Sequence, residues 1–144
     1  MHEKIQILNK FKTGREKNIQ SYFGKNLVKN IKICDVYKFN NILNRKNYNL
    51  ACELLYNPIS QKIFNKENIR EVLKKFGNFP WILEVGYLPG VTDNLGNTAT
   101  EIVREKLNIS DNNFKITSSQ VFLASVKNKS IIHDIAKEYS NSLV

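Results

Sequence analysis

The chain has 144 residues, of which 42% are hydrophobic, and this is enough for one ordinary domain with a buried core. Its 22 basic and 13 acidic residues give a formal net charge of +9, a balance compatible with a nucleic-acid or anionic-membrane partner. The positive charge is mostly lysine scattered along the chain, which favours a solvated surface instead. No apolar run approaches the roughly 20 residues of a membrane-spanning helix, and the first residues are charged, so we expect a cytoplasmic protein.

The first 64 residues alternate between strand-like and helix-like patterns. Ile5 and Ile7 alternate with polar residues, which predicts a strand. A helix is expected after this strand, although Gly24 lies within it and has a low helix propensity. The predicted elements are a strand at 4–11, a helix at 13–27, one bent strand or two short strands at 30–40, a helix at 45–58 closed by Pro58, and a short strand at 59–64.

Residues 80–144 repeat this order. The best amphipathic pattern of the chain lies at 93–109, where Leu95, Ala99, Ile102 and Val103 have the spacing of one helical face. The predicted elements are a strand at 80–88, a helix at 93–109, a strand at 113–126 and a helix at 129–144.

The repeated order predicts an α+β fold made of two tandem βαββαβ (ferredoxin-like, split βαβ) units with antiparallel sheets. The units would comprise residues 1–64 and 80–144, joined by a linker with a short helix at 65–79. We expect the open faces of the two sheets to pack together. The strings LACE (50–53) and IAKE (135–138) match at a shift of 85 residues, as a diverged duplication would allow.

Carrying this shift forward pairs Ile59 with Val144, so the counterpart of the strand at 59–64 is missing from the second unit. Either that strand is dispensable, or the native chain continues beyond Val144. We favour the longer chain, because a missing strand leaves an unpaired sheet edge.

The strand at 80–88 is joined to the next helix by the sequence PGVTDN. Pro89 and Gly90 suit a type II turn, and Thr92 or Asp93 can accept a hydrogen bond from the first amides of the helix. The segment 98–101 also has the spacing of a capping box. A structural turn and a ligand or contact loop both remain open, since a helix N-terminus with small polar residues can also hold an anion.

The residue types that mark catalytic and metal sites are sparse. Cys34 and Cys52 form neither a CxxC motif nor a zinc-type array, so we expect buried, reduced thiols. His2 and His133 have no metal-ligand spacing. The sequence contains no glycine-rich ATP segment, and neither cysteine lies in a nucleophile elbow. We therefore assign no catalytic, cofactor-binding or metal residues.

The string EVGYLPGVTDNLGNTATEI, preceded by DVYKF and LLYNPISQKIF, resembles the N-terminal region of phosphoribosylformylglycinamidine synthase. The likeness is to the form in which the small S-type component is fused ahead of the synthetase domain. PGVTDN is the specific part, while elsewhere the resemblance is in pattern and covers essentially the whole chain. In that family this region resembles a pair of S-type subunits, each βαββαβ, and continues into a linker and the synthetase.

The resemblance implies a place in purine biosynthesis. The complete enzyme converts formylglycinamide ribonucleotide to formylglycinamidine ribonucleotide with ATP, magnesium and ammonia from glutamine. The N-terminal region holds the synthetase and glutaminase parts together without carrying either catalytic site, so we expect this chain alone to be inactive. Its expected partners are those two parts, and it could also pair with a second copy. The candidate inter-domain contact loop consists of Pro89, Gly90, Val91, Thr92, Asp93 and Asn94.

Two alternatives remain open at this stage. RNA-recognition folds share the βαββαβ order and stack bases on sheet aromatics, and Tyr37, Phe39 and Phe122 are the candidate aromatics here. A small-molecule regulatory domain is the other, because paired ferredoxin-like units often bind effectors at their interface.

Overall fold

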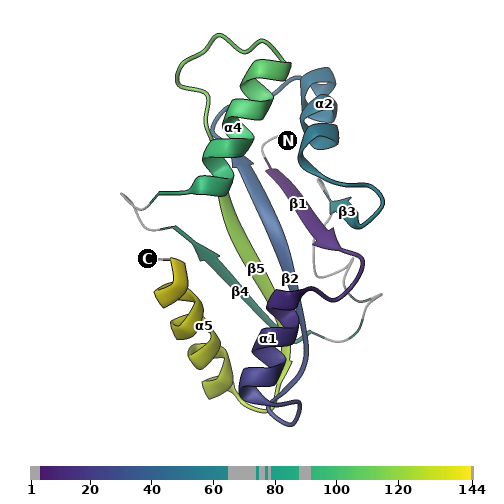
Figure 1. Ribbon diagram of the computed structural model, residues 1–144, viewed down its shortest axis with the longest axis vertical. Helices are drawn as coiled ribbons and strands as arrows, with labels where there is room; N and C mark the ends of the chain where they lie inside the picture. Colours follow the sequence, from purple (N-terminus) through teal and green to yellow (C-terminus); the bar gives the residue numbers. More distant parts are fainter. Residues whose placement is uncertain (1–3, 65–73, 75–76, 78, 88–91, 144) are drawn as a thin grey trace.

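The structure, a computed structural model, describes residues 4–64, 74, 77, 79–87 and 92–143 (Figure 1). The described strands and helices follow one another along the chain in the order that the sequence predicts. The elements are β1 (Lys4–Asn9), α1 (Gly14–Phe23), β2 (Val28–Phe39), α2 (Arg45–Leu55), β3 (Gln61–Phe64), β4 (Trp81–Gly86), α4 (Asn94–Lys106), β5 (Ile116–Val126) and α5 (Lys129–Leu143).

The five strands of the described residues form one antiparallel sheet in the order β3-β1-β2-β5-β4. The expectation of two sheets packed face to face is therefore wrong. The halves instead join edge to edge through β2 and β5, which pair from Val28↔Val126 to Phe39↔Ile116. β2 is a single strand of 12 residues with a register shift near Asn30, where one or two strands were expected. This α+β architecture is consistent with a ferredoxin-like type.

The helices pack on one face of the sheet in two pairs (Figure 1). α2 and α4 cover one end, with Tyr48 and Val103 buried against Ile5 and Ile116. α1 and α5 cover the other end through residues such as Ile19 and Ile135, which pack on Ile33 and Phe122 of the central strands. The face that the helices cover is thus apolar at both ends.

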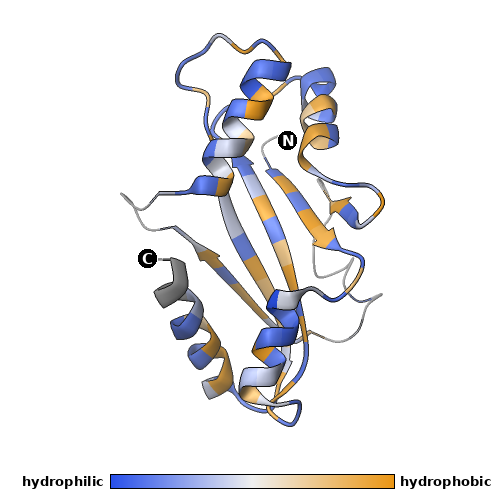
Figure 2. Cartoon of the chain, in the orientation of Figure 1, coloured by the Kyte–Doolittle hydropathy of each residue, from blue (hydrophilic) through white to orange (hydrophobic). Residues whose placement is uncertain are grey.

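The second face of the sheet also carries a buried apolar cluster. Alternate residues of a strand point to opposite faces, so the neighbours of Ile33 and Phe122 point away from the helices. Figure 2 shows hydrophobic residues, in orange, interspersed with hydrophilic residues, in blue, along β2. Phe79, which precedes β4, packs into the cluster. Its members are Leu8, Cys34, Val36, Phe64, Phe79, Val121 and Leu123.

The two halves are arranged about the centre of the sheet by an approximate half-turn in Figure 1. This rotation exchanges β1 with β4, α1 with α4, β2 with β5 and α2 with α5. Among the described residues, β3 pairs with β1, whereas the outer edge of β4 has no strand partner. The expected continuation beyond Val144 stays a prediction.

The match between LACE and IAKE does not correspond to equivalent positions in the two helices. At a shift of 85, Leu50 would align with Ile135, yet Leu50 is 38% exposed and Ile135 is 1% exposed. The buried residues of α2 are Tyr48, Ala51 and Cys52, and Leu50 is not among them. The repeated order of elements is the evidence for two similar halves, and the four-residue match is not.

Several element boundaries differ from the expectation. β1 ends at Asn9, which leaves Phe11 beyond the strand and 74% exposed. α1 ends before Gly24, whose φ of 87° suits glycine and stops the helix. The predicted short helix at 65–79 falls largely outside the described residues, and the division into units at 1–64 and 80–144 remains a prediction. In the part of the chain that the structure describes, no helix is long and apolar enough to span a membrane.

Candidate functional site at the junction between β4 and α4

The predicted contact loop lies between β4 and α4. Its first three residues, at 89–91, fall outside the described residues, whereas Thr92, Asp93 and Asn94 are described. Asp93 is the N-cap residue of α4, and its Oδ1 accepts a hydrogen bond from the backbone N–H of Gly96 at 2.8 Å. The prediction that Thr92 or Asp93 caps the helix is therefore confirmed for Asp93. The capping box predicted at 98–101 is wrong, because this segment lies inside α4.

Asp93 also ties the start of α4 to strand β5. Its Oδ2 accepts a hydrogen bond from the backbone N–H of Ser118 at 2.6 Å, and its Oδ1 accepts one from the Ser118 hydroxyl at 2.6 Å. Three donors therefore converge on one carboxylate, which is a strong arrangement because the acceptor is charged. This use of Asp93 is structural, and sequence reasoning missed its partner Ser118 because 25 residues separate the two.

Small residues allow α4 to lie close against β5. A Cβ atom at Gly96 would come 2.7 Å from the backbone oxygen of Ile116. One turn later, the Thr100 hydroxyl accepts a hydrogen bond from the Ile116 N–H at 2.9 Å and donates to the Gly96 carbonyl at 2.7 Å. Gly96 and Thr100 therefore position α4 against β5. They lie four residues apart, on one side of the helix. This spacing of small residues is visible in the sequence, but a search for apolar residues alone overlooks it.

This close contact turns α4 away from its predicted orientation. The helix buries Gly96, Ala99, Thr100 and Val103. Leu95 and Ile102, which the apolar pattern placed on the inner face, are instead 48% and 37% exposed. The prediction is correct for Ala99 and Val103 and wrong for these two large side chains.

The junction also has few charged side chains, and those have hydrogen-bond partners within the chain. Between positions 81 and 100 the only charged residues are Glu84 and Asp93, in a chain that is 24% charged. Glu84 accepts hydrogen bonds from Lys38 Nζ at 2.7 Å and from the Ser119 hydroxyl at 2.8 Å. The hydrogen bond from Lys38 lowers the pKa of the Glu84 carboxyl. Both acidic groups therefore already have partners within the chain.

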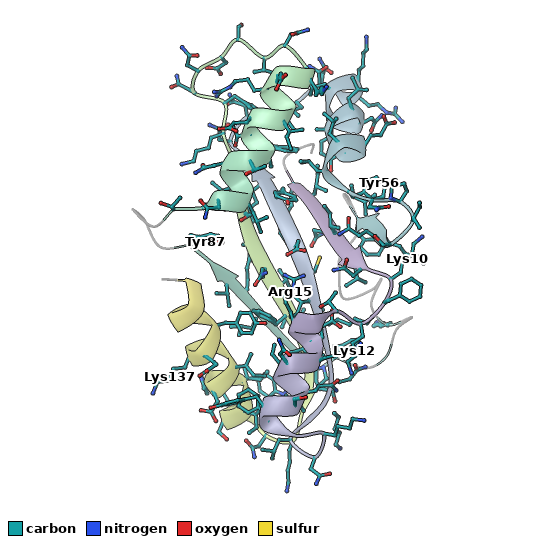
Figure 3. All side chains as sticks on the ribbon, viewed as in Figure 1. Lys10, Lys12, Arg15, Tyr56, Tyr87 and Lys137 are labelled. Carbon is teal, nitrogen blue, oxygen red and sulfur yellow. The ribbon has the colours of Figure 1, made fainter. Side chains whose placement is uncertain are left out.

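A polar cluster lies over the middle of the sheet, between the two helix pairs. Arg15 of α1 donates hydrogen bonds to both carboxylate oxygens of Asp35, at 3.0 and 3.2 Å, and Figure 3 shows Arg15 over the central strands. Burial raises the pKa of the nearby Tyr37 hydroxyl, and the negative charges of Asp35 and Asp93 raise it further. The Tyr37 phenol therefore keeps its proton at neutral pH.

Two surface hollows flank the helices. One, of about 210 Å³, lies between α1 and α5 and is lined mainly by apolar groups such as Ile19, Phe23 and Tyr139. The other, of about 490 Å³, lies beside α4 and is lined by polar residues together with Phe114. In it, Arg104 donates hydrogen bonds to the backbone oxygens of Asn112 and Phe114, so the guanidinium holds the chain segment that leads into β5.

The two cysteines are free and buried, as the sequence predicts. Burial raises the pKa of the Cys34 thiol to about 12, which keeps it protonated and unreactive at neutral pH. His133 lies exposed on α5. Among the described residues, no group of three or more His, Cys, Asp or Glu side chains could hold a metal ion.

In comparisons with known proteins, no family model matches this chain, and no curated protein or solved structure is significantly similar to it. The resemblance of the junction sequence to phosphoribosylformylglycinamidine synthase therefore remains a prediction.

Proposed function

We propose that this chain is the N-terminal assembly domain of phosphoribosylformylglycinamidine synthase. In this role it bridges the synthetase and glutaminase parts of the enzyme and supports ammonia transfer between them, without carrying out chemistry itself. ATP and magnesium belong to the complete enzyme and not to this chain. The tandem S-type arrangement of units 1–64 and 80–144 is part of the proposal.

The observation that carries the proposal is the structural role of the junction sequence that resembles the family. The one carboxylate of its PGVTDN segment, Asp93, accepts three hydrogen bonds that join α4 to Ser118 of β5. The exposed side chains of Asn94 and Leu95, which follow Asp93, are uncharged and non-nucleophilic. These properties suit a rigid contact surface better than a catalytic loop.

The RNA-binding alternative is disfavoured by the placement of the sheet aromatics. Phe39 and Phe122 are 6% and 1% exposed and lie on the face covered by the helices. Phe122 also packs edge-to-face on Tyr139 of α5, with ring centroids 4.5 Å apart. Base stacking needs an open aromatic face, so these residues would have to lose their helices before they could bind RNA.

The proposal is tested by adding the chain to a synthetase preparation that lacks its N-terminal region, together with the glutaminase. We expect a complex of the three parts and a gain in formylglycinamidine ribonucleotide formed with glutamine. With an ammonium salt in place of glutamine, the gain should be smaller. The absence of both complex and gain would refute the assembly role.

Two controls separate the alternatives. The chain alone, with ATP, magnesium, an ammonium salt and substrate, should form no product, and product formation would overturn the non-catalytic assignment. Salt-dependent binding to an RNA homopolymer would instead support the nucleic-acid alternative.

A further inference from the structure

We propose that the apolar hollow between α1 and α5 binds a small organic cation that carries a methylated ammonium group. The hollow has a volume of about 210 Å³ and lies between a helix of the first half and a helix of the second half (Figure 1). The inference is independent of the proposed function, and its test needs this chain alone.

Three aromatic side chains line the hollow. Tyr22 and Phe23 come from α1, and Tyr139 comes from α5. The ring centroids of Tyr22 and Phe23 are 4.9 Å apart and the two rings are inclined by 79°, so together they form a corner instead of a flat surface. The face of an aromatic ring attracts a cation, and several rings around one hollow are the arrangement by which proteins bind methylated ammonium groups.

The charge of the lining also suits a cation. Among the described residues that line the hollow, the only charged side chain is the carboxylate of Glu138. Asp134, four residues earlier, is exposed on the same side of α5. The chain as a whole has a net charge of +9. A hollow whose one charged lining group is negative is therefore a local exception that favours a positively charged ligand.

Positively charged residues flank the hollow without lining it. Arg15 of α1 donates hydrogen bonds to both carboxylate oxygens of Asp35, and this pairing offsets its charge. Lys17 and Lys25 are exposed, and neither lines the hollow. Figure 3 shows Lys137 on the side of α5 away from α1. None of these cations therefore takes the position of the proposed ligand.

The apolar part of the lining selects among cations. Ile19 and Ile135, which also line the hollow, are only 5% and 1% exposed. A metal ion needs several oxygen ligands in place of its water, and an unsubstituted ammonium group has three donors that need acceptors. A methylated ammonium group instead presents methyl groups to the apolar lining and keeps its positive charge for the rings and Glu138.

Most of the site is in place before a ligand binds. Phe23 and Tyr139 pack on the core cluster beneath α1 and α5, and the Tyr139 ring also contacts the Phe122 ring edge-to-face. A site that is already ordered loses little conformational entropy on binding. Tyr22 is 71% exposed, so its side chain can be substituted without disturbing the core.

The test is a titration of the isotope-labelled full chain with tetramethylammonium chloride, followed by the backbone amide signals in NMR spectra. The comparison ligands are tert-butanol, which has a similar shape but no charge, and potassium chloride at the same ionic strength. We expect tetramethylammonium to cause saturable shifts at amides of α1 and α5 around the hollow. It should bind at least fivefold more tightly than tert-butanol, and potassium chloride should not reproduce the shifts.

Four variants examine the two kinds of contact. Glu138→Gln removes the negative charge and should weaken tetramethylammonium binding at least fivefold, whereas Glu53→Gln, at an exposed glutamate on α2, is the matched control and should leave it unchanged. Tyr22→Leu keeps an apolar side chain without a ring and should weaken binding several-fold. Tyr22→Phe keeps the ring and should bind as the wild type does. The amide spectrum of each variant verifies that it is folded.

Several results would overturn the cation site. The first is the absence of saturable shifts around the hollow with tetramethylammonium. Equal binding of tert-butanol, or undiminished binding by Glu138→Gln or Tyr22→Leu, would show that the hollow is a general apolar site. An equal loss for Glu53→Gln would assign the effect to the net charge of the chain. None of these results bears on the assembly role, which is tested with the synthetase and glutaminase parts.

Discussion

Asp93 accepts hydrogen bonds from both the backbone N–H and the side-chain hydroxyl of Ser118, each at 2.6 Å. The same carboxylate caps α4 through the Gly96 N–H. One side chain therefore satisfies donors from a helix start and from a strand that lies 25 residues further along the chain. The junction sequence between β4 and α4 therefore joins the start of α4 to β5 in the second half of the chain.

Replacement of Asp93 by alanine should destabilise the fold. The loss of an N-cap costs about 1 kcal/mol, and a buried donor left without its acceptor costs a further 1–3 kcal/mol or so. Urea unfolding of Asp93→Ala should therefore show a clearly lower midpoint. The control is Asp134→Ala, which changes an exposed aspartate on α5. Equal midpoints for the two variants would contradict this role of Asp93.

Gly96→Ala should destabilise the protein although alanine is the better helix former by about 1 kcal/mol. The new methyl group would lie 2.7 Å from the Ile116 backbone oxygen, and overpacking of this kind costs roughly 1–3 kcal/mol. Gly14→Ala is the matched control, because nothing lies within 4 Å of the added atom. Thermal unfolding should show a lower Tm for Gly96→Ala only. A rise in both would mean that α4 can move away from β5.

Glu16→Gln should stabilise the protein, and increasingly so at higher pH. Glu16 is 1% exposed, and its Oε2 has no hydrogen-bond partner among the described residues. Burial raises the pKa of its carboxyl above the ordinary value of 4.5, although Lys32 and the hydroxyl of Thr13 act in the opposite direction.

The direction of this pH dependence follows from linkage. As the pH rises above 4.5, the carboxyl ionises first in the unfolded chain, so the folded state loses stability until the pH exceeds the folded-state pKa. Glutamine removes this loss. Urea unfolding of both proteins between pH 5 and 8 should show the variant gaining on the wild type as the pH rises. The opposite trend would show that the ionised carboxylate is stabilised in the fold.

Cys34 should be inert to thiol reagents in the native protein. Its thiol is buried and its pKa is raised to about 12, so almost no thiolate is present at pH 8. A colorimetric disulfide reagent should react slowly with native Cys52→Ala, which retains Cys34 as its only cysteine. The same variant should react with one equivalent after unfolding in urea. Rapid reaction in the native state would contradict the burial of Cys34.

Element order and type could be predicted from the sequence because they depend on local patterns. The strand predicted at 80–88 corresponds to β4, whose neighbouring residues Ile82 and Leu83 belong to clusters on opposite faces of the sheet. The arrangement of the strands could not be predicted. The pairing of β2 with β5 joins residues such as Ile33 and Phe122, which are far apart in sequence.

At the candidate site, too, contacts between residues close in sequence could be predicted, and contacts between distant residues could not. The cap at Asp93 was predictable, because it involves a donor only three residues away. The orientation of α4 was not, because the apolar pattern ranks Leu95 above Gly96 as a core residue, whereas close contact with β5 favours the residue without a side chain.

The antiparallel seam between β2 and β5 resembles the interface of a two-fold symmetric dimer, in which both partners contribute the same element. In a true homodimer any substitution occurs twice, so a docking surface cannot change on one subunit alone. A single chain carrying both halves is free of this constraint. Here α4 has Gly96 against the sheet and Leu95 outside, while α1, its counterpart, buries Glu16 and Gln20. Each half can thus be adapted to a different neighbour while the shared sheet stays intact.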